Sequence, residues 1–279
     1  MKVLVAEKCG FCPGVRSAIR TAEQVLAQTA GREPVSCLGP IIHNPTEVAR
    51  LAQAGLRIVE SVDQIEKGTV LIRSHGAAPA QIEALKSKGL RIIDATCVLV
   101  KRLQRIATSL EEDGYQVVII GQPDHPEVQA VCGHLRRPIV VACKQDLAGV
   151  ELGPKIGIVS QTTQTPQRFA AMVAVICEGR FTELKIVNTL CRESCKRQEA
   201  AVRLCKEVDI MFVLGGLDSA NTRSLAELCR QHNPNTYHLE GIKDLDPRII
   251  KGKSVAGVTA GASTPDAVIQ QFVQVLERS

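Results

Sequence analysis

The chain of 279 residues is 45% hydrophobic and 3% aromatic, carries a formal net charge of +5 and contains 11 cysteines. This length suffices for two or three compact units, and the mild charge without a long Lys/Arg run argues against nucleic-acid binding. The segment MKVLVAEKC turns polar too early for a signal peptide, and no segment suits a membrane span. We therefore expect a cytoplasmic protein with reduced thiols and no disulfide framework.

Alternating strand and helix patterns run through the whole chain. Amphipathic stretches predict helices at KRLQRIATSLEEDG, which Gly114 ends, at NTRSLAELCRQH, and at PDAVIQQFVQVLERS, where Pro265 suits the first turn. This alternation predicts an α/β fold with mainly parallel sheets. Apolar, β-branched runs predict strands at residues 2–6, 69–74, 91–95, 116–121, 155–160, 210–215 and 254–259.

Three cysteines lie in three unlike motifs: Cys12 in GFCPGV, Cys97 in DATCVLV and Cys191 in NTLC. The gaps of 85 and 94 residues are too wide for a local zinc knuckle and nearly equal. They suggest that each of three similar units offers one thiolate to a shared centre. An odd ligand set leaves a coordination position free for substrate, which is typical of a catalytic centre.

The same spacing predicts the domain organisation. We expect a first α/β unit at 13–96, a second at 97–190 and a third at 191–279, with the N-terminal strand 1–12 joining the third.

Other interpretations of the cysteines stay open. Cys9 and Cys12 form a C-x-x-C, which alone is also compatible with a redox pair or half of a zinc site, although no second C-x-x-C follows at finger spacing. Cys195 follows Cys191 by four residues, so both Cys9 and Cys195 could lie near the centre. We expect the remaining cysteines to be buried as small hydrophobic residues.

Polar motifs follow six of the predicted strands: SHG, TC, QPDHPE, QTTQ, GLDSAN and AGAS. In open α/β sheets, ligands bind beyond the carboxyl ends of the strands. A single shared site explains this placement better than scattered sites.

Three histidines occur in loops beside Gly, Pro or Asn: His43 in GPIIHNP, His75 in RSHGA and His125 in DHPEV. A lone loop histidine is usually a surface residue, but three in such loops favour an anion such as a diphosphate.

Ser219 and Asn221 precede one predicted helix, and Ser263 precedes another. Their ordinary role is N-capping. Free N–H groups at the same helix ends also attract phosphate, so both roles stay open.

Glu127 is the one carboxylate among these groups, in the sequence His125-Pro126-Glu127. A carboxyl shielded from water can hold a proton and deliver it to a leaving group. Thr162, or Thr163 beside it, could relay that proton. The alternative is an acidic helix-initiating residue and two strand-end threonines.

Together these motifs resemble the 4-hydroxy-3-methylbut-2-enyl diphosphate (HMBPP) reductase family. The matching segments occur in the family's order along essentially the whole chain: GFCPGV, GPIIHNP, RSHG, DATCVLV, HPEV, SQTTQ, NTLC, the SAN of GLDSANTR, and TAGAS.

The resemblance implies three α/β units around a central [4Fe–4S] cluster, with three protein ligands and one open iron. It also implies reduction of HMBPP to isopentenyl and dimethylallyl diphosphate, the terminal step of the non-mevalonate pathway, with a small ferredoxin or flavodoxin as electron donor. The residues that the resemblance assigns are Cys12, Cys97 and Cys191 to the cluster; His43, His75, His125, Ser219, Asn221 and Ser263 to the diphosphate; and Glu127, helped by Thr162, to proton delivery.

Two positions depart from the family pattern. Ala220 stands where many members have a second serine, and loss of one charge-assisted hydrogen bond costs about 1.5–3 kcal/mol unless water substitutes. Val98 replaces a proline, which we expect to affect only the local backbone.

Two alternative functions stay open at this point. An iron–sulfur hydro-lyase would also use three cysteines and an open iron, but it would need no electron donor. A non-enzymatic metal or oxygen sensor would leave the histidine, serine and Glu127 loops unexplained.

Overall fold

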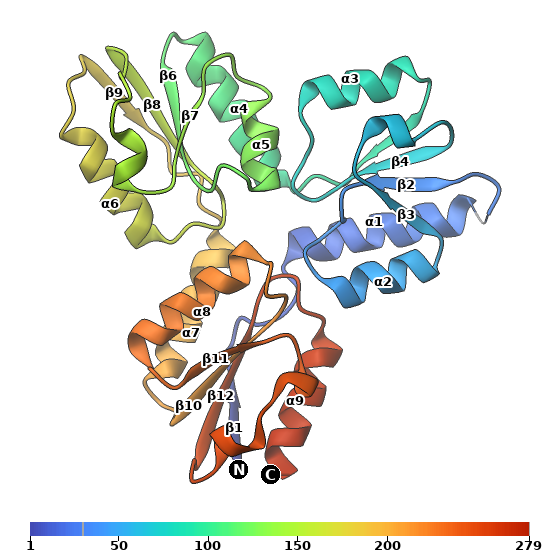
Figure 1. The fold of residues 1–279 in the computed structure, drawn as a ribbon, viewed down its shortest axis with the longest axis vertical. Coiled ribbons are helices and arrows are strands. Elements are labelled where there is room, and N and C mark those ends of the chain that lie inside the picture. Colours follow the sequence, from blue (N-terminus) through green and yellow to red (C-terminus); the bar gives the residue numbers. More distant parts are fainter. Residues whose placement is uncertain (30, 279) are drawn as a thin grey trace. The chain divides into compact units, whose positions relative to one another are not determined.

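The computed structural model describes residues 1–29 and 31–278. Within these residues the strands form three four-stranded sheets, and every strand pair is parallel. Figure 1 shows each sheet with its own helices. The predicted fold class, three α/β units with parallel sheets, is confirmed.

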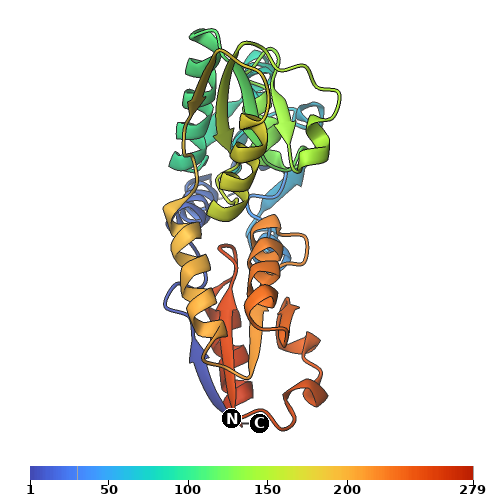
Figure 2. The same cartoon turned by 90° about the vertical axis from the view of Figure 1, so that its left-hand side faces the viewer.

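The first sheet joins the two ends of the chain. Its strand order is β1-β12-β10-β11, so β1 pairs with β12 (Figure 2). The elements of this part are β1 (Lys2–Val5), α7 (Arg192–Cys205), β10 (Ile210–Leu214), α8 (Ala220–His232), β11 (Thr236–Leu239), β12 (Val255–Ala260) and α9 (Asp266–Arg278).

The second sheet has the order β3-β2-β4-β5 and the third the order β7-β6-β8-β9. The elements around the second sheet are α1 (Pro13–Thr29), β2 (Val35–Leu38), α2 (Pro45–Gln53), β3 (Leu56–Val59), β4 (Thr69–Ile72), α3 (Pro79–Ser87) and β5 (Arg91–Asp94). Those around the third are α4 (Val98–Glu112), β6 (Gln116–Ile120), α5 (Pro126–Cys132), β7 (Ile139–Val141), β8 (Lys155–Ser160), α6 (Pro166–Cys177) and β9 (Glu183–Ile186). Short 3₁₀ turns lie at Val62–Gln64, Lys144–Leu147, Ile242–Asp244 and Pro247–Ile250.

The described residues divide into two compact units. Unit 1 comprises Met1–Arg16, His43–Ala49 and the described residues from Arg192 onward, and holds the first sheet. Unit 2 comprises the described residues of Ser17–Ile42 and Arg50–Cys191, and holds the other two sheets. The three domain boundaries expected from the cysteine spacing stay a prediction.

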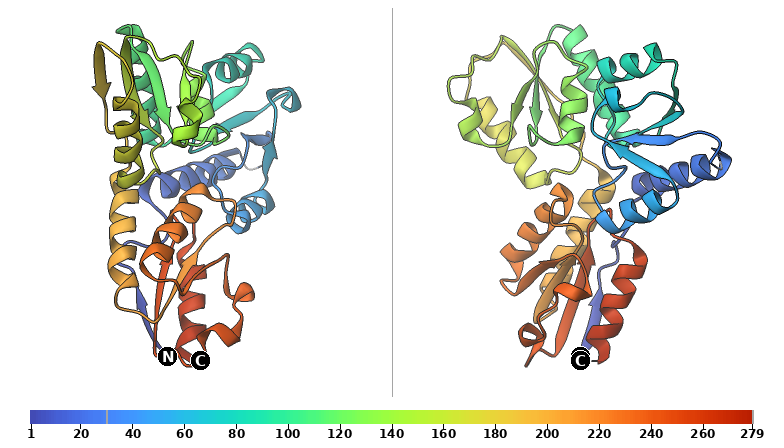
Figure 3. Two further views of the ribbon diagram at one scale, coloured as in Figure 1. Left: turned by 60° about the vertical axis from the view of Figure 1, so that its left-hand side comes forward. Right: turned by 45° about the vertical axis from the view of Figure 1, so that its right-hand side comes forward.

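The first sheet is covered on both faces, as the two-residue period of a strand requires. Met211 and Val213 pack with the helices α7 and α8, whereas Phe212, between them, packs with Phe272 of α9. Figure 3 shows α9 against one face of this sheet and α7 and α8 against the other. Because both faces are buried, β10 is a continuous apolar run rather than an alternating one.

The third sheet is built in the same way. Leu103 and Leu110 of α4 lie in one apolar cluster with Val117 and Ile119, and Met172 of α6 lies in a second cluster on the other face. Helix α4 ends at Glu112, and Gly114 follows with φ +83°, which confirms the predicted stop.

Among the residues that the structure describes, none of the helices has the length and apolar character that crossing a membrane requires.

Candidate active site

All six polar motifs follow the carboxyl ends of strands in parallel sheets. Ser74 and His75 follow β4, Cys97 follows β5 and His125 follows β6. In the same way, Thr162 follows β8, Ser219 and Asn221 follow β10, and Ser263 follows β12. The predicted site residues therefore fall into two groups, one in each unit, and each group is described separately.

In unit 2, backbone hydrogen bonds hold Cys97 beside the His75 loop. The Cys97 N–H donates to the Ser74 carbonyl at 3.0 Å. The Ser74 hydroxyl, which is buried, donates in turn to the Ile41 carbonyl at 3.1 Å. The cysteine and His75 thus lie on two neighbouring loops whose backbones are connected.

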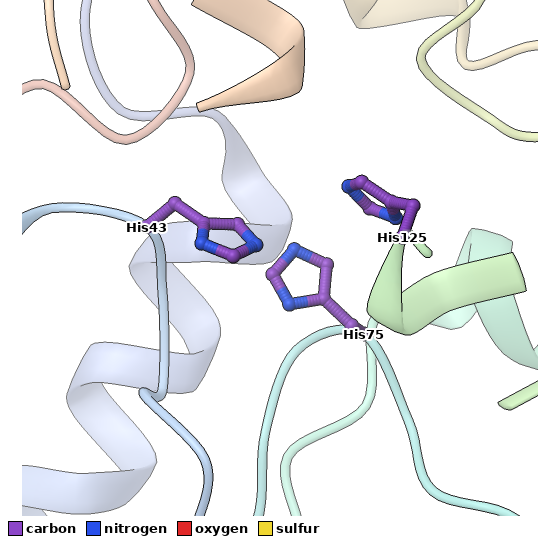
Figure 4. Close-up of side chains that lie close together, drawn as sticks. All are labelled: His43, His75 and His125. Carbon is purple, nitrogen blue, oxygen red and sulfur yellow. The ribbon is translucent and has the colours of Figure 1, made fainter. Parts of the chain in front are cut away.

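His75 and His125 lie close together in unit 2. Their ring centroids are 5.4 Å apart and the rings are nearly perpendicular, at 89°. Figure 4 shows these two imidazoles, together with His43, which belongs to unit 1. The Glu127 N–H donates to His125 Nδ1 at 3.1 Å, so His125 is also the N-cap of α5. A neutral His125 therefore carries its proton on Nε2, where it can be donated to an anion.

Glu127 is buried and bound by one threonine. Its side chain is 2% exposed; Oε1 accepts the Thr162 N–H at 2.6 Å and Oε2 accepts the Thr162 hydroxyl at 2.8 Å. Burial raises the pKa of Glu127, and the two Thr162 bonds, which favour the carboxylate, oppose that effect. Glu127 is thus an acid that holds its proton to a higher pH than an exposed glutamate does.

The same threonine connects Glu127 with Cys191. The Cys191 N–H donates to the Thr162 carbonyl at 2.8 Å. Contacts in unit 2 therefore run from Cys97 through the His75 loop to His125 and Glu127, and from Glu127 through Thr162 to Cys191. These are six of the residues that the sequence predicts for the site.

The raised pKa of Glu127 predicts how stability depends on pH. An unfolded glutamate has a pKa of about 4.3, and the pKa of Glu127 in the native state is higher. At a pH between these two pKa values, the native state keeps the proton on Glu127 and the unfolded state has lost it. The free energy of unfolding then falls with rising pH. Glu127→Gln removes this loss, so we expect the stability of the variant relative to wild type to increase as the pH rises above about 4.3. Urea denaturation of both proteins measures the difference.

Glu112→Gln, at an exposed position of α4, is the control for this comparison. The difference in the free energy of unfolding between this variant and wild type should be the same at every pH measured. A pH-independent difference for Glu127→Gln would contradict the prediction.

In unit 1, Cys12 lies against the loop that follows β12. Its N–H donates to the Ala262 carbonyl at 3.1 Å, one residue before Ser263. The Ser263 hydroxyl donates to the backbone carbonyl of His43 at 2.9 Å. Cys12, Ser263 and His43 therefore lie on segments in direct contact.

The residues around the start of α8 also belong to unit 1. Ser219 is the N-cap of α8 and accepts the Thr222 N–H, which confirms its structural role without excluding an anion. Ser194, which the sequence analysis missed, donates to Asn221 Oδ1 at 3.4 Å. That bond fixes which way the Asn221 amide points. Ala220 is buried at the start of α8, where its methyl group offers no donor.

Each of the three predicted ligand cysteines directly precedes a helix. Cys12 precedes α1, Cys97 precedes α4 and Cys191 precedes α7, and all three are half-buried. The Val15 N–H in the first turn of α1 points at Cys12 Sγ, at 3.4 Å. Unpaired N–H groups and the positive end of a helix stabilise a thiolate. The chemistry of each of these three positions, taken singly, therefore fits a thiolate ligand of a metal centre.

The two neighbouring cysteines differ from these three. Cys9 packs against the apolar cluster of the first sheet, and burial raises the pKa of its thiol to about 11. Cys195 lies one turn inside α7, and burial together with Glu199 raises its pKa. Protonated thiols are poor metal ligands. The expectation that the remaining cysteines are buried is wrong for Cys143 and Cys177, which are exposed.

Val98 is the first residue of α4 and is 75% exposed. Proline is common at this first helical position, so the exchange of proline for valine is compatible with the local backbone.

Gln161 is a further residue that the sequence analysis missed. Its Oε1 accepts the Gln122 N–H at 3.0 Å, and its Nε2 donates to the Thr163 hydroxyl at 3.2 Å. Gln161 is 1% exposed and so holds the loops after β6 and β8 together. The sequence signal that could have identified Gln161 is its position directly after the apolar strand β8.

Known proteins are similar to this chain over nearly its whole length. A model of the family described as LytB protein matches residues 3–277. A 4-hydroxy-3-methylbut-2-enyl diphosphate reductase of Aquifex aeolicus (strain VF5) is 42% identical over 273 residues, 96% of this chain and 93% of that protein. A protein of the same name from Syntrophotalea carbinolica is 39% identical over 276 residues, covering 98% of each.

Solved structures give the same result. A structure described as (E)-4-hydroxy-3-methyl-but-2-enyl diphosphate reductase, the terminal enzyme of the non-mevalonate pathway, is 40% identical, with a TM-score of 0.73 and full coverage of both chains. The E-1-hydroxy-2-methyl-but-2-enyl-4-diphosphate reductase of Plasmodium falciparum is 26% identical, with a TM-score of 0.93, covering 99% of this chain and 87% of that one.

Proposed function

This chain belongs to the LytB protein family, and from that premise we propose that it is an oxidoreductase that converts HMBPP to isopentenyl and dimethylallyl diphosphate. This is the terminal step of the non-mevalonate (methylerythritol phosphate) pathway. The observation that supports it best is the connection of Glu127, through Thr162, to Cys191. Reductive loss of a hydroxyl group is helped by an acid that protonates the leaving oxygen, and this contact chain joins such an acid to the loop of a proposed cluster ligand.

Members of this family bind a [4Fe–4S] cluster. We propose that Cys12, Cys97 and Cys191 hold it and that one iron has no protein ligand. When bound, the cluster supplies a Lewis-acidic iron and the electrons for cleavage of the allylic C–O bond. The three cysteines precede three helices, so this ligand set is supported by their placement.

Glu127 would donate the proton that lets the substrate hydroxyl leave as water. Its raised pKa keeps the acid form available, and Thr162 fixes both carboxyl oxygens. Over the whole reaction the substrate gains two electrons and two protons, loses one water, and keeps its diphosphate.

The diphosphate would be bound by His43, His75, His125, Ser219, Asn221 and Ser263. His125 is the best prepared of these, because the Glu127 N–H bonds to Nδ1 and leaves Nε2–H as the donor. Ser263 donates to the His43 carbonyl here and would have to turn its hydroxyl towards a phosphate oxygen. Groups that hold the diphosphate anchor the substrate far from the reacting bond.

We further propose that a small ferredoxin or flavodoxin supplies the electrons and that the enzyme works in the cytoplasm. The 11 cysteines support the latter, since compartments that keep thiols reduced suit such a composition.

An anaerobic assay tests the function. Protein reconstituted with iron and sulfide, given HMBPP and a chemical reductant, is expected to form both diphosphate products, as measured by mass spectrometry. Without reductant we expect no turnover, and conversion of HMBPP in that arm would instead indicate a hydro-lyase. Protein that takes up no iron, or that holds iron but leaves HMBPP unchanged, would contradict the proposal.

A further inference from the structure

Arg197 is a buried arginine in the second turn of α7. Its side chain is 4% exposed. Nη1 donates to the Ala260 carbonyl and Nη2 donates to the Gly10 carbonyl, each at 2.8 Å. One guanidinium therefore connects two segments that lie 250 residues apart in the chain.

Both acceptors belong to segments that carry predicted site residues. Gly10 lies two residues before Cys12, and Ala260, the last residue of β12, lies three residues before Ser263. The two segments also touch directly, through the Cys12 N–H and the Ala262 carbonyl. Arg197, the Cys12 segment and the Ser263 loop therefore each contact the other two.

Gly10, in the Cys12 segment, packs closely against the start of α9. Gly10 has φ +75°, and a Cβ at that position would lie 2.7 Å from Asp266 Oδ1. This close approach leaves no room for a side chain at position 10. The Gly10 carbonyl accepts a bond from a fixed, planar donor, and such charge-assisted bonds are stronger than those between neutral groups.

The charge of Arg197 is the second part of the argument. A guanidinium keeps its positive charge at any physiological pH. Buried in this part of the protein, that charge acts on any anion bound near Cys12. An iron–sulfur centre held by thiolates is such an anion, and its reduction potential depends on the charge around it.

We propose that Arg197 is a positioning residue, which holds the Cys12 segment against the Ser263 loop and places a buried positive charge beside the thiolate-bound centre. The second half of this proposal rests on the proposed function, because it requires Cys12 to be a ligand. The first half concerns only the protein chain and can be tested separately.

The test compares Arg197→Met, which removes the charge and both bonds, with Arg197→Lys, which keeps the charge but not the two-pronged donor. Arg203→Met is the matched control, because Arg203 lies on the same helix but is exposed and paired with Glu7. The full chain is used throughout, and circular dichroism shows whether each variant is folded.

Hydrogen exchange tests the contact. The Cys12 amide should exchange about tenfold faster in both Arg197 variants, since a bond to a charged group is lost or weakened. Arg203→Met should match wild type. Unchanged exchange in folded Arg197→Lys and Arg197→Met would overturn the inference, whether or not the chain binds iron.

Iron release and reduction potential test the link with the site. After reconstitution, Arg197→Met should lose iron to a chelator about 10–100-fold faster than wild type, as the loss of an outer-shell contact does at metal sites. Its potential should be lower, whereas Arg197→Lys should keep a potential near wild type. If Arg197→Met exchanges its Cys12 amide faster but keeps the iron release rate and the reduction potential of wild type, Arg197 is only structural. That result would overturn the positioning role. Wild-type protein without iron would instead overturn the proposed function.

Discussion

Serine at position 12, 97 or 191 is expected to abolish turnover and to reduce the affinity for the cluster by more than about 100-fold. Loss of an outer-shell partner alone costs about 10–100-fold at a metal site, and a hydroxyl is a much poorer ligand for iron than a thiolate. Iron and sulfide content after anaerobic reconstitution, together with the visible absorption, measures the effect.

The controls are the thiols beside two of these ligands. Cys9→Ala and Cys195→Ala should keep their iron, because burial raises the pKa of both thiols and Cys9 packs against an apolar cluster. Mössbauer spectra with and without HMBPP should then show a change at one iron in wild type and in both controls. Loss of iron in Cys195→Ala equal to that in Cys191→Ser would contradict this assignment of ligands.

All seven strands predicted from the sequence are present among the described residues, and four of the five that were missed share one feature. Four of them, β3, β7, β9 and β11, lie at the edges of their sheets. An edge strand is only partly buried, so it needs no continuous apolar run; β9, with the sequence ELKI, is mostly exposed. The fifth, β2, is buried inside its sheet but contains Ser36 and Cys37, which hide the pattern.

Motif placement was more informative for the site than periodicity. The rule that ligands bind beyond the carboxyl ends of parallel strands predicts the loops that carry His75, Cys97 and Glu127 without any coordinates. The sequence could not predict that Thr162 binds both oxygens of Glu127 and also accepts the Cys191 amide, because these contacts join three different loops.

The burial of Arg197 is also a property that the sequence alone does not predict. In the sequence it is one of several charged residues on the polar helix α7, whose sequence is RESCKRQEAAVRLC. Only tertiary packing distinguishes it from Arg203, since the first is buried against two carbonyls and the second lies at the surface. Charge and helical position alone do not reveal a buried cation.

Glu127→Gln is expected to lower kcat by about 10²–10⁴-fold, the usual contribution of a positioned general acid, while the iron content and the KM for HMBPP stay near wild type. A glutamine amide can still accept the Thr162 N–H and bond to its hydroxyl, so the loop should keep its conformation. What it lacks is a proton that it can give to the leaving hydroxyl. Steady-state kinetics with a chemical reductant, on protein of measured iron content, separates the two effects.

Two further measurements make this test specific to proton transfer. Thr162→Val keeps the backbone N–H bond to Glu127 and loses only the hydroxyl bond, so its kcat should fall less than that of Glu127→Gln. In wild type, kcat should decrease as pH rises through the raised pKa of Glu127, because only the protonated form acts as an acid. Glu127→Gln should lack that decrease. If both proteins lose activity over the same pH range, another group supplies the proton and Glu127 serves only to hold Thr162 and the Cys191 loop.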